Sequence, residues 1–334
     1  MSVDTHHRFS PVFITGATGF VGVHATHAFL EAGYQVKVLV RPTSDLSRLP
    51  NQVEKVIGSL EHPSSLRDGL KGCRSVVHIA GLVRVKRGED FYQINREGTH
   101  NLVQIAQEVG IERLIYISSQ AAGGPSTPYR PRMTDDPDSP VTDYGRSKLE
   151  GEMVLRQGNW RFWWAIIRPP VVYGPWDRAF LPFIRWVKRG FKVRLSSGKM
   201  PFSIIFAPDL AQAIRMALEV NSPTGNIWFV TDGNEYTLVD LGEAVEKALN
   251  RKAHWLTIPG WVAPFLSWTI KRAEAIKLFR FARNEVWRKA IELSQPAWTC
   301  DDKPFRQVSG FEPQYDLFSG MAETVKWYMK MGWI

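Results

Sequence analysis

Apolar and polar positions follow two periods along the first half of the chain. Short runs that are almost continuously apolar alternate with stretches in which apolar residues recur every three or four positions. The first pattern is typical of strands buried on both faces, and the second of helices that cover them. The pattern predicts strands at 11–15, 35–41, 54–60, 75–81, 113–119 and 162–170, with helices at 19–33, 63–72, 91–110 and 144–158.

This alternation predicts an α/β fold with a doubly wound parallel sheet. After residue 173 the alternation stops, and helical periods dominate at 179–190, 207–220 and 237–250. One further apolar run, 226–232, is suited to rejoin the sheet. We therefore predict a sheet domain over residues 1–173, completed by a returning strand near 226–232, and a smaller, mainly helical substrate lobe over 174–334.

Composition indicates a globular chain. Its 334 residues are 44% hydrophobic and 22% charged, which excludes a disordered protein. The first ten residues lack the apolar run of a signal peptide, and no stretch reaches the roughly 18–20 apolar residues of a spanning helix. The two cysteines, Cys73 and Cys300, cannot form a disulfide framework. A cytoplasmic location is therefore expected.

The net charge of +9 indicates an anionic partner of some kind. The basic residues are spread along the chain, and neither zinc-ligand spacing nor a nucleic-acid-binding module is present, so we expect a small-molecule substrate, no nucleic acid and no metal. His24 and His27 share one face of a predicted helix without a carboxylate or cysteine nearby. They are expected on the helix surface.

Three glycines, Gly16, Gly19 and Gly22, lie where the first predicted strand gives way to a helix. A plain turn needs fewer. At this spacing the first glycine permits a tight turn, the second lets the backbone approach a pyrophosphate, and the third lets the helix pack close to the strand. The amino end of the helix then offers free N–H groups to phosphate. The sequence therefore predicts a dinucleotide-binding Rossmann domain.

The stretch "TGATGFVG" at 15–22 resembles the TGxxGxxG fingerprint of the extended short-chain dehydrogenase/reductase superfamily, the NAD(P)-dependent epimerase/dehydratase group. The resemblance continues in order through "HIAG", "INREGTHNL", "YISS", "YGRSK" and "RPPVVYGP". Apolar segments near the end are similar to those of the 3-beta-hydroxysteroid dehydrogenase and dihydroflavonol reductase branch. The resemblance implies cofactor contacts at Thr15, Gly16, Thr18, Gly19, Phe20, Val21, Gly22, Ser59, Leu60, Ala80, Gly81, Ser118, Tyr144, Lys148, Pro170 and Val171.

The end of the second predicted strand favours NADP(H), with NAD(H) as the alternative. NAD-binding relatives place an acidic side chain there, whereas this chain has Val40 followed by Arg41. An arginine can pair with the 2′-phosphate of NADP, and Ser44 can assist. The sequence departs from the family at Ser59, where an aspartate near the adenine is usual.

The catalytic group is predicted at Tyr144, Lys148 and Ser119. Tyr144 and Lys148 are four residues apart, hence on one helix face, and a neighbouring ammonium favours tyrosinate. The resemblance implies that Ser119, 25 positions before Tyr144, orients the substrate oxygen, which makes Ser118 chiefly structural. Asn95 either braces the site from its helix or is a helix-surface amide.

The segment 255–293 combines apolar and aromatic residues with seven basic ones. It is either a pair of amphipathic helices with a solvated basic side, or a lid that contacts a membrane surface or admits a lipid-like substrate. A peripheral membrane contact and a homodimer both stay open.

Three functions remain. The first is an NAD(P)-dependent oxidoreductase that moves hydride between nicotinamide and a carbonyl or hydroxyl carbon of an apolar, steroid-, terpenoid- or flavonoid-like substrate. The second is a nucleotide-sugar epimerase with tightly bound NAD⁺. The third, a non-catalytic NAD(P)-binding protein, is disfavoured because Tyr144 and Lys148 are both present.

Overall fold

The computed structural model describes residues 8–84, 91–195, 200–258 and 291–334. Within these residues a seven-stranded sheet runs in the order β10-β6-β5-β4-β1-β2-β3, and every neighbouring pair is parallel. The predicted doubly wound α/β fold is confirmed. The strands are β1 (Val12–Thr15), β2 (Val36–Val40), β3 (Glu54–Ile57), β4 (Ser75–His78), β5 (Arg113–Ile117), β6 (Trp163–Arg168) and β10 (Asn226–Phe229).

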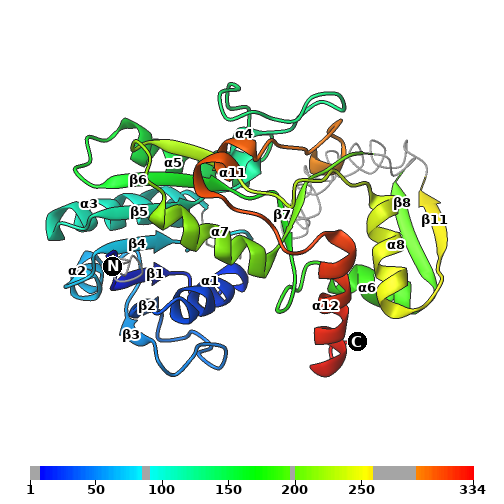
Figure 1. Cartoon of the computed structure of the whole chain (residues 1–334), viewed down its shortest axis with the longest axis horizontal. Helices are drawn as coiled ribbons and strands as arrows, with labels where there is room; N and C mark the ends of the chain where they lie inside the picture. The colour runs from blue at the N-terminus through cyan, green and yellow to red at the C-terminus, as the bar shows by residue number, and fades with distance from the viewer. Residues whose placement is uncertain (1–7, 85–90, 196–199, 259–290) are drawn as a thin grey trace, which may run out of the picture.

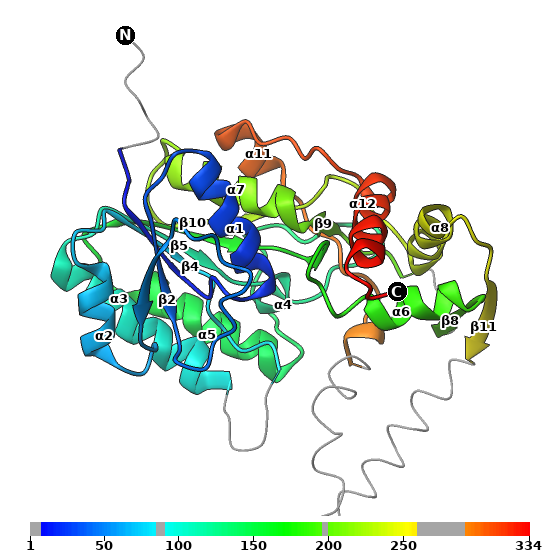
Figure 2. The same ribbon diagram turned by 90° about the horizontal axis from the view of Figure 1, so that it is seen from below.

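Helices cover both faces of the sheet (Figure 2). One face packs against α1 (Phe20–Glu31) and α7 (Ala207–Glu219), and its apolar core includes Phe29 and Ile214. The other face packs against α2 (Pro63–Leu70), α3 (Thr99–Val109) and α5 (Asp143–Gln157). Burial on both faces explains why the strands read as continuous apolar runs.

The position of α7 corrects the sequence-based division of the chain. That helix follows residue 173 and was assigned to the substrate lobe, but it packs against α1 and contributes Leu210, Ile214 and Leu218 to the core of the sheet domain. The return of the strand near 226–232 is confirmed, because β10 pairs with β6 at the edge of the sheet. The return of α7 was not predicted.

The predicted helix over 91–110 is not regular throughout. Its first part is a π-helix, η2 (Gln93–Gly98), and α3 continues from Thr99. Wider π turns occur frequently at functional sites. Here the wide turn contains Asn95, whose side chain bonds to the backbone of Leu82 beyond the end of β4.

The second lobe has its own apolar core, which contains Tyr173, Leu241 and Tyr328. Figure 1 shows it beside the carboxyl ends of the sheet. Two small parallel sheets, β7 with β9 and β8 with β11, were not predicted. Its elements are β7 (Val171–Tyr173), α6 (Leu181–Lys188), β8 (Phe191–Leu195), β9 (Ile204–Phe206), α8 (Leu238–Leu249), β11 (His254–Ile258) and α12 (Leu317–Lys330). The helix α11 (Lys303–Ser309) instead contributes Phe305 to the core of the sheet domain.

The segment 255–293 lies mostly outside the described residues, so neither of its interpretations is tested. Its first residues, 255–258, form a strand rather than a helix, because they belong to β11. Among the helices that the structure describes, none has the length and apolar character needed to cross a membrane.

Candidate active site

The three glycines are held in close backbone contacts. Gly16 has a φ of +76°, and a Cβ built on it would lie 2.6 Å from the backbone nitrogen of Ala80. A Cβ on Gly22 would lie 2.0 Å from the carbonyl oxygen of Gly16. The Gly19 N–H donates to that same oxygen at 2.9 Å. The loop thus closes on itself between β1 and β4, where the strand order reverses.

The loop suits an anionic dinucleotide. The N-cap of α1 is Gly19, which has no side chain that could cap the helix and is exposed. The first turn of α1 has no acidic residue. The first N–H groups of a helix have no intrahelical acceptor and carry partial positive charge. These features fit a pyrophosphate at the start of α1. Thr18, Phe20 and Val21 are half-buried around this point.

Thr15, predicted to contact the cofactor, belongs to a buried chain of hydrogen bonds. The Thr99 hydroxyl donates to the Asn95 carbonyl at 2.8 Å, so its oxygen accepts from His78 Nε2–H at 2.9 Å. His78 Nδ1 then accepts from the Thr15 hydroxyl at 2.6 Å, and the Thr15 oxygen accepts from Ala80 N–H at 3.3 Å. The chain joins the glycine loop to η2.

His78 is neutral within this chain. Burial, followed by the positive charge of Lys148, lowers the pKa of His78 to about 3. A neutral imidazole has one donor and one acceptor nitrogen, which matches the single direction of these hydrogen bonds.

Tyr144 and Lys148 lie on α5, as predicted. Thr142 caps this helix, since its hydroxyl accepts from Gly145 N–H at 3.2 Å. A Cβ on Gly145 would lie only 2.3 Å from the carbonyl oxygen of Ala121. Glycine therefore lets the start of α5, with Tyr144, approach the short helix α4 (Gln120–Gly123), whose N-cap is Ser119. The Tyr144 ring is half-buried and lies 6.1 Å from the ring of Phe91.

Lys148 is buried below Tyr144. Its Nζ donates to the carbonyl oxygen of Ile117 at 2.8 Å and lies 4.3 Å from the centre of the Tyr116 ring. Burial lowers the pKa of Lys148 to about 7, and the negative charge of Glu152 opposes that shift. An ammonium group has three donors, so two remain for other partners.

Ser119 and Ser118 have different partners at the end of β5. The Ser119 oxygen accepts from Ala121 N–H at 3.1 Å, which orients the hydroxyl and leaves its hydrogen to donate. The Ser118 hydroxyl donates to Glu152 at 2.5 Å and is buried. The Ser118 N–H also donates to the carbonyl oxygen of Ile167 at 2.8 Å, so both contacts are of the structural kind expected for Ser118. Its predicted cofactor contact stays a prediction.

Asn95 is completely buried, so the alternative of a helix-surface amide is wrong. Its Oδ1 accepts from Leu82 N–H at 2.8 Å, and its Nδ2 donates to the Leu82 carbonyl and to the Ser147 hydroxyl. Ser147 precedes Lys148 on α5. Asn95 therefore braces α5 against the segment after β4, where Ala80 is half-buried and Gly81 exposed.

The residues predicted around the adenosine differ in their exposure to solvent. Arg41 is exposed after β2, and its backbone N–H donates to the Ser44 hydroxyl at 3.1 Å. The Ser59 oxygen accepts from Glu61 N–H at 3.3 Å. Leu60 is buried in the apolar core, so its side chain packs rather than faces a ligand.

Pro170 and Val171 follow β6, and Val171 is exposed. Farther along this segment, the carbonyl of Pro175 accepts from His24 Nε2–H at 2.9 Å. His24 is therefore not simply a surface residue as expected, although His27 is exposed. Burial lowers the pKa of His24. The contact ties α1 to the segment that enters the second lobe.

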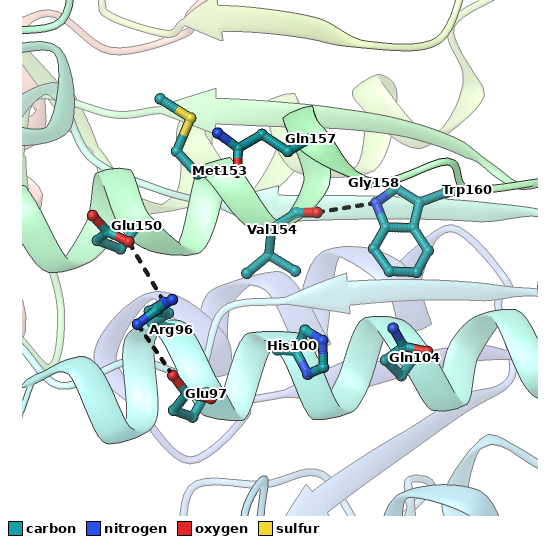
Figure 3. Close-up of a pocket in the computed structure, with 10 residues that line it drawn as sticks. All are labelled: Arg96, Glu97, His100, Gln104, Glu150, Met153, Val154, Gln157, Gly158 and Trp160. Carbon is teal, nitrogen blue, oxygen red and sulfur yellow. Dashed lines mark hydrogen bonds and ion pairs between the residues drawn. The ribbon is translucent and has the colours of Figure 1, made fainter.

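A separate pocket of about 420 Å³ lies on the outer face between α3 and α5 (Figure 3). Arg96 reaches Glu97 and Glu150 there, each at 3.5 Å. The lining is mainly polar, with Trp160 at one end. This pocket is away from the glycine loop and was not predicted.

The homodimer stays a prediction.

His78, Ser147 and Glu152 were not predicted as residues of the site. His78 lies in the quoted "HIAG" stretch, but its partners are 63 and 21 residues away. Glu152 could have been noticed, because Tyr144, Lys148 and Glu152 follow one another at steps of four along one helix face.

Comparison with known proteins finds relatives over nearly the whole chain. Sterol demethylase protein B of Methylococcus capsulatus is 33% identical and covers 96% of this chain and 99% of its own length. Ceramide reductase of Caulobacter vibrioides is 27% identical over 97% of this chain and 96% of its own. The crystal structure of UDP-glucose 4-epimerase with UDP-glucose from Thermotoga maritima has a TM-score of 0.77 at 18% identity, covering 96% of this chain and 99% of that one. The last comparison shows the fold alone.

Residues 12–230 match the NAD dependent epimerase/dehydratase family. This span includes the glycine loop, α4, α5 and all seven strands of the large sheet. The chain therefore belongs to the NAD dependent epimerase/dehydratase family, whose members are expected to bind NAD or NADP.

Proposed function

We propose that the protein is an NADP(H)-dependent oxidoreductase that moves hydride between nicotinamide and a carbonyl or hydroxyl carbon of an apolar, steroid-, terpenoid- or flavonoid-like substrate. The observation that carries the proposal is the approach of α5 to the end of β5. There Lys148 bonds to Ile117, and Gly145 meets Ala121, two residues after Ser119. Open α/β sheets bind their ligands at this edge.

When bound, the nicotinamide supplies or accepts the hydride. Tyr144 donates a proton to the substrate oxygen during reduction and takes it back during oxidation. The Lys148 ammonium stabilises the tyrosinate, because a nearby positive charge lowers a phenol pKa. The Ser119 hydroxyl donates a hydrogen bond to the same substrate oxygen, already oriented by its contact with Ala121.

Arg41 supports NADP(H) over NAD(H). It is exposed directly after β2, where a guanidinium can pair with a 2′-phosphate. The side chain of Val40 cannot accept a hydrogen bond from a ribose hydroxyl. Two relatives bear the names of a sterol and a ceramide, which supports an apolar substrate. The alternative is a nucleotide-sugar epimerase that retains NAD⁺, and the family name, which includes epimerases, supports it.

The test uses NADPH deuterated at the transferable position and a panel of apolar ketones. We expect deuterium in the alcohol product, and in Tyr144→Phe a loss of kcat of at least about 100-fold with NADPH binding nearly unchanged, because the proton donor is removed. The matched control is Tyr129→Phe, whose side chain is 97% exposed. Full activity in Tyr144→Phe would contradict the assignment.

A further inference from the structure

Two buried contacts join α5 to the end of β5, one helical turn apart. Lys148 Nζ donates to the carbonyl oxygen of Ile117 at 2.8 Å, and the Ser118 hydroxyl donates to Glu152 Oε1 at 2.5 Å. Lys148 and Glu152 are four residues apart and therefore lie on the same helix face. Ser119 follows directly in the chain. The distance between Tyr144 on α5 and Ser119 after β5 thus depends on the Glu152 carboxylate.

The same carboxylate holds the end of β6. Arg168 Nε donates to Glu152 Oε1 at 2.8 Å and Nη2 donates to Oε2 at 2.5 Å, a bidentate pair in which the Arg168 and Glu152 side chains are 1% and 0% exposed. Arg168 Nη2 also donates to Asp138 at 2.7 Å. Bidentate pairing fixes orientation as well as distance. Pro169 and Pro170 follow Arg168, so Glu152 connects α5 and β5 to the segment that contains Pro170, a predicted cofactor contact.

Glu152 also determines the charge around Lys148. From β4, His78 faces this ammonium as a neutral imidazole, and from β5 the Tyr116 ring lies 4.3 Å away. Tyr144 lies on the same helix, and η2 contributes the uncharged Asn95. The negative charge that opposes deprotonation of Lys148 comes from Glu152, which from β6 is also paired with the Arg168 guanidinium. A buried ammonium without such a partner favours its neutral form.

We propose that Glu152 is a positioning residue of the active site, which fixes α5 against the ends of β5 and β6 and supplies the negative charge that faces the Lys148 ammonium. This inference rests on the proposed function, because that function assigns Tyr144, Lys148 and Ser119 their roles. Glu152 itself is completely buried and contacts the reaction only through these residues.

The test is Glu152→Gln, which keeps the size of the side chain and removes its charge. Its first readout is the dissociation constant of NADPH, which is measured by tryptophan fluorescence. We expect a value close to wild type at about pH 6 and at least about tenfold weaker binding than wild type at about pH 8, because loss of the carboxylate lowers the pKa of Lys148 further and leaves less of its charged form in the variant. The second readout is ketone reduction. In the pH profile of kcat/KM, the alkaline limb of Glu152→Gln should lie at lower pH than that of wild type, by about one unit or more.

Two further variants separate charge from position. Ser118→Ala removes the hydroxyl contact and keeps the charge, so kcat should fall about tenfold while the alkaline limb stays where it is. Glu150→Gln is the matched control on the same helix, because its side chain is 47% exposed and 3.5 Å from Arg96. It should behave as wild type in every readout.

Identical pH profiles of Glu152→Gln and wild type would overturn the proposal, as would a shift of equal size in Glu150→Gln. If Glu152→Gln does not fold, Ser118→Ala decides, and an unchanged kcat overturns the positioning role. A wild-type protein that binds NADPH but reduces no ketone refutes the proposed function alone. The binding measurements then still test Glu152.

Discussion

Replacing Gly22 by alanine should lower the stability of the protein, whereas replacing Gly19 by alanine should weaken cofactor binding. A Cβ on Gly22 would lie 2.0 Å from the Gly16 oxygen, 2.7 Å from the Gly16 carbonyl carbon and 2.8 Å from Ala17 Cα. All three atoms are backbone, so α1 or the loop must move by about 1 Å to restore ordinary contact. A Cβ on Gly19 would meet only the Gly16 oxygen, at 3.1 Å, and Gly19 is exposed with a φ of −78°.

The magnitudes follow from these contacts. Overpacking of this kind costs about 1–3 kcal/mol, and each kcal/mol lowers the melting temperature of a domain this large by about 2–4 °C. Gly22→Ala should therefore melt several degrees below wild type without any cofactor. Gly19→Ala should melt close to wild type, yet its methyl group stands where the pyrophosphate approaches the helix, so NADPH should bind at least about tenfold more weakly.

The assay is thermal unfolding with and without NADPH, together with titration calorimetry. Bound ligand raises the melting temperature according to its affinity, so NADPH should stabilise wild type more than Gly19→Ala. The reasoning is refuted if Gly19→Ala binds NADPH as tightly as wild type. It is equally refuted if Gly22→Ala melts at the wild-type temperature.

Two other predictions concern charged residues of the site. Arg41→Ala should weaken NADPH by about 10- to 100-fold and leave NADH nearly unchanged, since a charge-assisted hydrogen bond contributes about 1.5–3 kcal/mol; equal losses in calorimetry would remove the 2′-phosphate argument. Lys148 has a folded pKa of about 7, below its ordinary 10.5, so the unfolded chain binds more protons between these values and stability should rise with pH there. Urea unfolding should show that Lys148→Met loses this rise, up to about 1.4 kcal/mol per pH unit, whereas parallel curves for both proteins would contradict it.

The sheet domain could be predicted from sequence because its strands are buried on both faces. Stretches such as 11–14 and 114–117 are apolar without interruption, and glycines or helix periods bound them. The small strands β7, β8, β9 and β11 have three to five residues and lie in two-stranded sheets, so no comparable pattern marks them. The packing of α7 on α1 was missed for a different reason: periodicity predicts a helix and its apolar face but not the partner of that face.

The placement of Tyr144 and Lys148 on one helix could be predicted because the two residues are local, and a spacing of four puts them on one face of that helix. The supporting contacts are not local. Glu152 meets Ser118 across 34 residues and Arg168 across 16, and His78 meets Thr15 across 63. Such contacts depend on which strands become neighbours in the sheet, and a single sequence does not contain that information.

The most direct test of the proposed oxidoreductase is native mass spectrometry of the purified protein, first alone and then with equal amounts of NADPH and NADH. We predict a protein that is purified without nucleotide and then forms mainly the NADPH complex. Retained NAD⁺ that neither nucleotide displaces would contradict an exchanging reductase and indicate the nucleotide-sugar epimerase instead.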